Sequence, residues 1–287
     1  MTDPTVVAIG GGHGLSVVLE ALVDRCASLT GVVSVADDGG SSGRLRRDLA
    51  IVAPGDMRRC LGALAPDGLA RDALEHRFAT GVLAGHPAGN VLLAAMLEIE
   101  SDPVVVMDTL AAMVGARGRV LPATAEPVDL IATTDRGTVK GQVAVSESRT
   151  IDSIRYWPAD PTVPSAVLTA IAEADAVIVG PGSLYTSVLA PVVPGVAAAL
   201  AASHATVIYV ANLAGEPEET DGYDLGDHIE AVVRHGIDPD VVVSDHSAVA
   251  SDAWVGKVEM FELTSGQPDM HDPHRLGLAL ASIISAG

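Results

Sequence analysis

Short apolar runs rich in β-branched residues alternate along this chain with segments in which apolar residues recur every three or four positions. Residues 5–9 have the first pattern and predict a buried strand. Leu15, Val18, Leu19 and Leu22 have the second pattern and predict a helix after a glycine turn. The same patterns predict strands at 32–36, 176–179, 206–211 and 241–243, and helices at 56–64, 89–98, 166–173 and 224–234. This alternation predicts an α/β fold with a Rossmann-like, doubly wound, mostly parallel sheet.

The pattern changes in the middle of the chain. Two β-rich runs, 128–133 and 138–145, flank the turn sequence of residues 134–137, which is typical of a hairpin. Residues from about 118 to 157 are therefore predicted to form a small β-hairpin insertion. The whole chain, 1–287, is predicted to be one α/β domain around it.

Composition narrows the class of protein. The 287 residues are 48% hydrophobic, enough for a large core, and carry a formal net charge of −20. That charge argues against a nucleic-acid partner, since few cations are present to replace counterions. The longest apolar runs hold seven residues, far below the roughly 18 of a membrane span. No basic segment precedes the first strand, so no signal peptide is predicted. Two cysteines cannot form a disulfide framework, which favours a reducing, cytoplasmic location.

The glycine turn at residues 10–14 is a candidate anion site, because a strand that turns sharply into a helix leaves backbone N–H groups free. Asp37 follows Gly12 by 25 residues, about where dinucleotide folds place a ribose-binding acid. The dinucleotide pattern nevertheless fails, since Leu15 occupies its last glycine position, and no Walker lysine is present. A turn that serves packing alone is the alternative.

A second candidate is the motif ADDGGSSGRLR at residues 36–46. Its glycines admit an anion close to the backbone, its serines add donors, and its arginines suit phosphate. Residues 44–59 hold five arginines and two aspartates, a local excess of positive charge in an acidic protein. If the segment is extended, Arg44 and Arg46 project to one side and Arg47 to the other. An Asx-turn-rich loop is the structural alternative.

Three further loops have similar chemistry, at 54–59, 85–90 and 180–187. The histidines have no metal-site spacing, and residues 271–274 are predicted to be a surface loop. Ser183 lacks the elbow motif of a serine nucleophile, and Cys60 is predicted to lie in the core.

Together these loops resemble the YvcK family of gluconeogenesis factors, which is similar to the 2-phospho-L-lactate transferases. The matching stretches are 10–16, 36–46, 54–58, 83–90, 116–124 (ARGRVLPAT), 180–187 (GPGSLYTS) and 219–223 (ETDGY). The resemblance implies a cytoplasmic regulator of carbon metabolism, cell-wall synthesis and cell shape that binds nucleotide sugars, notably UDP-N-acetylglucosamine, and has no established catalytic activity. The chain departs from the family pattern at His13, where a threonine is usual.

Two hypotheses use the same loops, and the resemblance favours the first. In that hypothesis the chain binds a UDP-sugar without a required cofactor and acts through a protein partner in cell-wall synthesis or as a homodimer. In the second, Asp38 and Asp56 hold magnesium while a nucleoside-diphosphate-linked donor is attacked, as in a phospholactyl-type transferase. A protein-interaction module using the acidic second half of the chain is a third alternative. The predicted ligand contacts are Gly11, Gly12, His13, Gly14, Leu15, Asp37, Asp38, Gly40, Ser41, Ser42, Gly43, Arg44, Arg46, Gly55, Asp56, Asn90, Gly180, Gly182, Ser183, Tyr185, Thr186 and Asn212.

Overall fold

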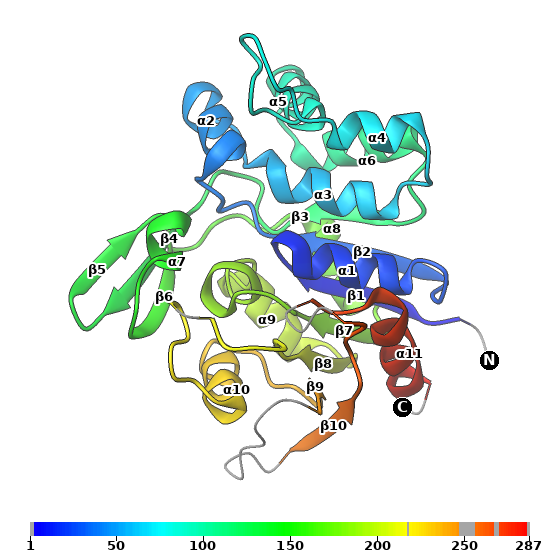
Figure 1. Cartoon of the computed structure of the whole chain (residues 1–287), viewed down its shortest axis with the longest axis vertical. Helices are drawn as coiled ribbons and strands as arrows, with labels where there is room; N and C mark the ends of the chain where they lie inside the picture. Colours follow the sequence, from blue (N-terminus) through cyan, green and yellow to red (C-terminus); the bar gives the residue numbers. More distant parts are fainter. Residues whose placement is uncertain (1–2, 217, 247–255, 267–269, 286–287) are drawn as a thin grey trace.

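The computed structural model describes residues 3–216, 218–246, 256–266 and 270–285, and Figure 1 shows their arrangement. The strands are β1 (Thr5–Gly10), β2 (Ser28–Val33), β3 (Arg119–Pro122), β4 (Asp129–Thr134), β5 (Gly137–Lys140), β6 (Ile151–Trp157), β7 (Ala176–Val179), β8 (Thr206–Val210), β9 (Val241–Asp245) and β10 (Lys257–Phe261). The helices are α1 (Gly12–Leu22), α2 (Gly40–Leu49), α3 (Pro54–Leu64), α4 (Leu69–Glu75), α5 (Ala88–Ile99), α6 (Pro103–Val114), α7 (Gln142–Ser146), α8 (Ser165–Ala172), α9 (Pro194–Ala202), α10 (Leu225–Arg234) and α11 (Pro273–Ile284), with a π-helical turn η1 (Leu184–Val188).

The central sheet has seven strands in the order β10-β9-β8-β7-β1-β2-β3, and every neighbouring pair is parallel. Strands β1 and β7 are buried along almost their whole length, as expected for parallel strands covered on both faces. The chain builds outward from β1 through β2 to β3, and later from β7 through β8 and β9 to β10. The doubly wound fold is thus confirmed, and the winding reverses between β1 and β7.

Helices α2 to α6 gather at the end of the molecule beyond β3, while α1 and α11 pack against each other beside β1 (Figure 1). The buried face of α1, with Leu15, Val18, Leu19 and Leu22, joins the core as its spacing predicts. Among the described residues, the helices are too short or too polar to cross a lipid bilayer.

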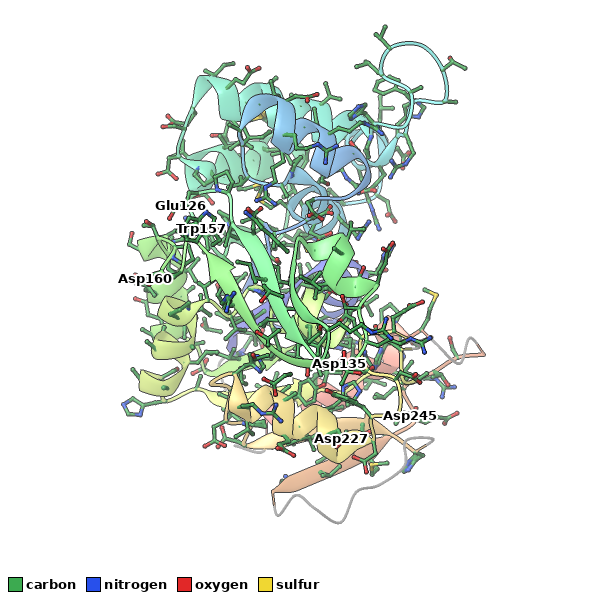
Figure 2. The ribbon with its side chains drawn as sticks, turned by 90° about the vertical axis from the view of Figure 1, so that its left-hand side faces the viewer. Glu126, Asp135, Trp157, Asp160, Asp227 and Asp245 are labelled. Carbon is green, nitrogen blue, oxygen red and sulfur yellow. The ribbon has the colours of Figure 1, made fainter. Side chains whose placement is uncertain are left out.

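Strands β4, β5 and β6 form a separate antiparallel sheet in the order β5-β4-β6, which confirms the β-rich insertion. Figure 2 shows this sheet from the front, with Asp135 near its turn and Trp157 toward the opposite end. The predicted strand at 138–145 is too long. It ends at Lys140, because Gly141 has a φ of +103° and a short helix, α7, follows.

Other boundaries also differ from the sequence prediction. Strand β2 runs from Ser28 to Val33 rather than over residues 32–36, and it pairs along this whole length with β1. Helix α3 begins at Pro54 rather than residue 56, and α5 begins at Ala88 rather than residue 89. Asp56 therefore lies in the first turn of α3 instead of capping it. The cap predicted at Asp224 is confirmed, and Asp227 completes a capping box.

The expectation of an extended segment at 44–47 is wrong. Those residues lie in α2, which begins at Gly40 and buries Ser41, Ser42 and Gly43. Gly43 allows this packing, since a Cβ there would lie 1.8 Å from the Asp38 carbonyl oxygen. On a helix, side chains are distributed every 100° rather than on alternate sides, so the three arginines do not divide as predicted.

Candidate functional site

A cavity of about 440 Å³ opens where the winding of the sheet reverses. Open α/β sheets bind ligands at this point, because the loops from adjacent strands run apart there. Its lining combines Gly11 before α1 and four residues of α1 with the loops that follow β7 and β8, one residue of η1 and two residues before α11. The lining residues are Gly11, Gly12, His13, Gly14, Val17, Pro181, Gly182, Ser183, Ser187, Asn212, Leu213, Ala214, Gly215, Glu216, Met270 and His271. Seven of these residues belong to the set predicted from the sequence.

The glycine turn after β1 forms one wall of the cavity. Gly12 has a φ of +60°, a conformation that a side chain would strain. It opens α1, so backbone N–H groups and the positive end of the helix dipole face the cavity. Leu15 lies beneath this turn and is completely buried, so its side chain belongs to the core and cannot contact a ligand.

The loop after β7 forms the facing wall. Gly180 and Gly182 both have positive φ, and the Gly182 N–H donates to Asn212 Oδ1 at 2.8 Å. Tyr185 and Thr186 are buried behind this loop in η1. They support the cavity wall from behind.

Two glutamates from the segment after β8 hold this loop in place. Glu216 Oε1 accepts from Ser183 Oγ at 2.8 Å, and Glu219 Oε2 accepts from the Tyr185 N–H at 2.9 Å. Glu219 also accepts from the hydroxyl of Thr186. Burial raises the pKa of Glu216 above its ordinary value and that of Glu219 to about 7. The matching stretch 219–223 therefore stabilises the loop.

Asp56 connects the cavity to a second group of predicted residues. It receives a backbone hydrogen bond from Gly12, and Arg59 Nη1 lies 3.4 Å from its Oδ1. Burial raises the pKa of Asp56, the charge of Asp37 adds to this effect, and Arg59 opposes it. Gly55 packs directly between Asp37 and Ser42, with room for no side chain. Asp37, Gly55 and Asp56 therefore meet beside the glycine turn.

Asp38 points elsewhere. Its Oδ1 accepts from the N–H of Val143 in α7 at 2.9 Å, so it links the loop after β2 to α7. The structure thus places Asp37, rather than Asp38, beside Asp56.

The N-terminus of α2 carries a chain of polar contacts. Ser41 Oγ lies 2.8 Å from His86 Nδ1 and accepts from Asn90 Nδ2 at 3.1 Å. Arg44 Nε donates to His86 Nε2, and buried Arg58 donates to Asn90 Oδ1. Because Arg44 occupies Nε2 as an acceptor, Nδ1 carries the proton and donates to Ser41. Two arginines therefore polarise the Ser41 hydroxyl as a donor.

The other predicted arginine has a different environment. Arg46 Nη2 lies 2.5 Å from Asp129 Oδ1, and Nη1 donates to the Ala36 carbonyl at 3.2 Å. Arg47 donates to the Asp38 carbonyl. Gly40 has a φ of +48° and no neighbour within 4 Å of an added Cβ. Arg46 thus joins α2 to β4, and its charge is paired within the protein.

His13 lies at the mouth of the cavity on α1. Burial lowers the pKa of His13, and the charges of Arg59 and Arg58 lower it further. Arg59 also lies near the glycine turn, 3.8 Å from the position of a Cβ on Gly12. This cation was not among the predicted contacts, although its loop was singled out.

Glu216, Met270 and His271 were also missed. Residues 271–274 are not the predicted surface loop, because Asp272 caps α11 and His271 lines the cavity. The cap signal Asp272-Pro273 was available in the sequence. The approach of α11 to the cavity depends on tertiary packing that no local pattern reports. Cys60, by contrast, is buried in the core as predicted.

Comparison with known proteins gives consistent results. The family model of 2-phospho-L-lactate transferase CofD matches residues 6–279. A relative from Deinococcus radiodurans is 38% identical over 305 residues, which cover 97% of this chain and 65% of that protein. The gluconeogenesis factor of Halalkalibacterium halodurans is 39% identical over 284 residues, covering 96% of this chain and 87% of that protein. A crystal structure of a UPF0052 family member from Bacillus halodurans superposes with a TM-score of 0.90 at 34% identity, covering 98% of this chain and 99% of that one.

Proposed function

The chain belongs to the CofD family and groups there with the gluconeogenesis factors, as its loops predicted, and from this premise we propose that it is a cytoplasmic nucleotide-sugar-binding regulator of carbon metabolism and cell-wall synthesis. UDP-N-acetylglucosamine is the ligand that the resemblance implies. A protein partner in cell-wall synthesis and a homodimeric form belong to the same proposal. The observation that carries the nucleotide assignment is the cavity between the β1 and β7 loops, with Asp56 and Arg59 of α3 lying beside its glycine turn.

The geometry supports a diphosphate beside the glycine turn. The N-terminus of α1 offers N–H groups to an anion, and His13 adds a side-chain donor at the cavity wall. Arg59 supplies positive charge from α3. Beyond Asp56, the polarised Ser41 hydroxyl and Arg44 extend the donor surface toward α2. A nucleotide sugar has the mixture of charged and uncharged groups that such donors bind.

The alternative is a magnesium-dependent transferase of the phospholactyl type. Magnesium commonly binds through one or two carboxylates together with substrate phosphates. Asp37 and Asp56 are a fitting pair for this, whereas Asp38 is bound to α7. Within the described ranges, histidines, cysteines and acids do not assemble in threes as a metal site. When bound, the metal would neutralise phosphate charge and polarise a phosphoryl oxygen.

Thermal unfolding in the presence of nucleotides tests the proposal. UDP, UDP-N-acetylglucosamine, GDP, NAD and ATP are compared with and without magnesium. Ligand at about a hundred times its Kd stabilises by about 2.7 kcal/mol, which raises Tm by roughly 5–10 °C for a chain of this size. We expect the UDP compounds to give a larger shift than NAD or ATP, because the dinucleotide glycine and the Walker lysine are absent. An equal shift with NAD or ATP would overturn that ranking.

The same samples separate binder from transferase. Product analysis after incubation of UDP-N-acetylglucosamine and magnesium with acceptor alcohols should show no turnover if the protein only binds. Turnover that requires magnesium and disappears in Asp56→Asn would establish the transferase instead.

A further inference from the structure

The cavity is chemically two-sided. The glycine turn, His13 and nearby Arg59 present donors and positive charge on one side. On the other side, Glu216 presents a carboxylate, which can only accept hydrogen bonds when ionised. A phosphate placed against Glu216 would be repelled, so this wall suits a part of the ligand that donates hydrogen bonds.

His271 adds a second acceptor to this wall. Its ring makes one hydrogen bond to the backbone of Ala211. Because this bond raises the pKa and thus favours the protonated ring, the ring nitrogen donates and the Ala211 carbonyl accepts. Nε2 is buried and without a partner, so the bonded nitrogen is Nδ1. Burial lowers the pKa of His271 to about 4, which keeps the ring neutral. Nδ1 then carries the hydrogen, and Nε2 is an acceptor.

A buried acceptor without a partner costs free energy that a ligand donor recovers. His271 and Met270 are neighbours in the cavity lining, and Met270 is 52% exposed and unbranched. A ligand can reach the ring by displacing this flexible side chain.

We propose that Glu216 and His271 form a wall of hydrogen-bond acceptors that recognises an uncharged N–H or O–H group of the nucleoside part of the ligand. This inference rests on the proposed nucleotide-binding function and orients the ligand, with the nucleoside at this wall and the phosphates at the glycine turn. The chemistry admits two sources, an imide N–H of the base or a hydroxyl of the ribose. Cytosine lacks the imide hydrogen, and 2′-deoxyribose lacks one hydroxyl.

Calorimetric titration with UDP, CDP and 2′-deoxy-UDP distinguishes the two sources. The wild-type protein should bind UDP at least tenfold more tightly than CDP if the base is read, or than 2′-deoxy-UDP if the ribose is read. His271→Phe keeps the ring shape without its nitrogens, and Glu216→Ala removes the carboxylate. Each should reduce that ratio to about threefold or less. Glu218→Ala, an exposed neighbour outside the lining, is the matched control and should keep the wild-type ratio.

Circular dichroism identifies a variant that fails to fold, and the other variant then decides the result. UDP binding by the wild-type protein with no preference among the three nucleotides, or with the same preference in the folded variants, overturns this inference alone. A wild-type protein that binds none of them overturns the proposed function, and this inference with it.

Discussion

Gly14 and Pro181 bring the β1 and β7 loops into direct backbone contact: a Cβ atom on Gly14 would lie 2.0 Å from the Pro181 carbonyl oxygen. Real Cβ atoms do not approach backbone oxygen so closely, so one of the two loops would have to move. Glycine at this position is therefore a requirement for the cavity, since both residues line it.

We expect Gly14→Ala to destabilise the protein by about 1–3 kcal/mol through overpacking and to abolish detectable UDP binding. Urea unfolding and calorimetry measure the two effects. Gly215→Ala is the control, because it lies in the same cavity and an added Cβ meets nothing within 4 Å. Equal stability and affinity in the two variants would show that the β1 and β7 loops can move apart without a loss of free energy.

Glu219 should make stability depend on pH. Burial raises its pKa from 4.5 to about 7. Between these pH values the folded protein retains a proton that the unfolded chain has released, so the free energy of unfolding falls as pH rises from about 4.5 to 7. The loss amounts to as much as about 3 kcal/mol above pH 7.

Glu219→Gln cannot ionise but keeps an acceptor for the backbone N–H groups of η1. Urea midpoints measured from pH 5 to 8 should therefore fall less steeply for Glu219→Gln than for the wild-type protein. Glu98→Gln, at an exposed position on α5, should follow the wild-type curve. Parallel curves for all three proteins would mean that Glu219 is ionised throughout.

Because Arg46 is paired with Asp129, we expect replacement of Arg46 to lower the stability of the protein rather than its affinity for the ligand. Their side chains are 11% and 28% exposed, and Lys140 Nζ lies 2.8 Å from the other oxygen of Asp129. We expect Arg46→Ala to lower stability by about 1–3 kcal/mol and to change UDP affinity less than threefold. Asp129→Asn should not add fully to Arg46→Ala in the double variant. A tenfold loss of affinity in Arg46→Ala would restore it as a ligand contact.

These arginines also show how far the sequence was informative. Apolar periodicity predicted the parallel sheet, and glycine turns predicted the cavity loops, because both signals are local. The conformation of residues 40–49 depends on Gly43 packing against Asp38, a contact between backbone segments that composition does not reveal. Glu216 and His271 reach the cavity through the loop after β8 and the segment before α11, and no local pattern of strands and helices reports the paths of these segments. Local patterns therefore predict where strands end more readily than which side chains meet there.

His13 should couple ligand binding to proton uptake. Burial and nearby arginines lower its pKa in the free protein, and a bound diphosphate should raise it again. Affinity should then increase as pH falls from 7.5 to 5.5. UDP-N-acetylglucosamine is the suitable probe, because its phosphates are both esterified and lack the ionisation near pH 6 of a terminal phosphate. We expect His13→Thr to flatten the pH profile of Kd, while identical profiles would place the ligand charge away from His13.

Arg59 is the cation that we expect to contribute most to phosphate binding. Its Nη1 lies 3.4 Å from Asp56 Oδ1 and 3.8 Å from the position of a Cβ on Gly12, so it faces the glycine turn from α3. The side chain is 27% exposed, which limits screening by water. A charge-assisted contact of about 1.5–3 kcal/mol corresponds to a loss of roughly 10- to 150-fold in UDP affinity for Arg59→Ala.

The matched control is Arg71→Ala on α4. This variant breaks an ion pair with Asp67, whose side chain is 96% exposed. That variant should bind UDP within about threefold of the wild-type protein. Arg59→Lys keeps the charge but not the planar fork, so its affinity should lie between the two. If Arg59→Ala binds as tightly as Arg71→Ala, the phosphates do not lie at the glycine turn. Arg44 beside the polarised Ser41 hydroxyl is then the next cation to test, and the ligand would extend along α2 instead of entering the cavity.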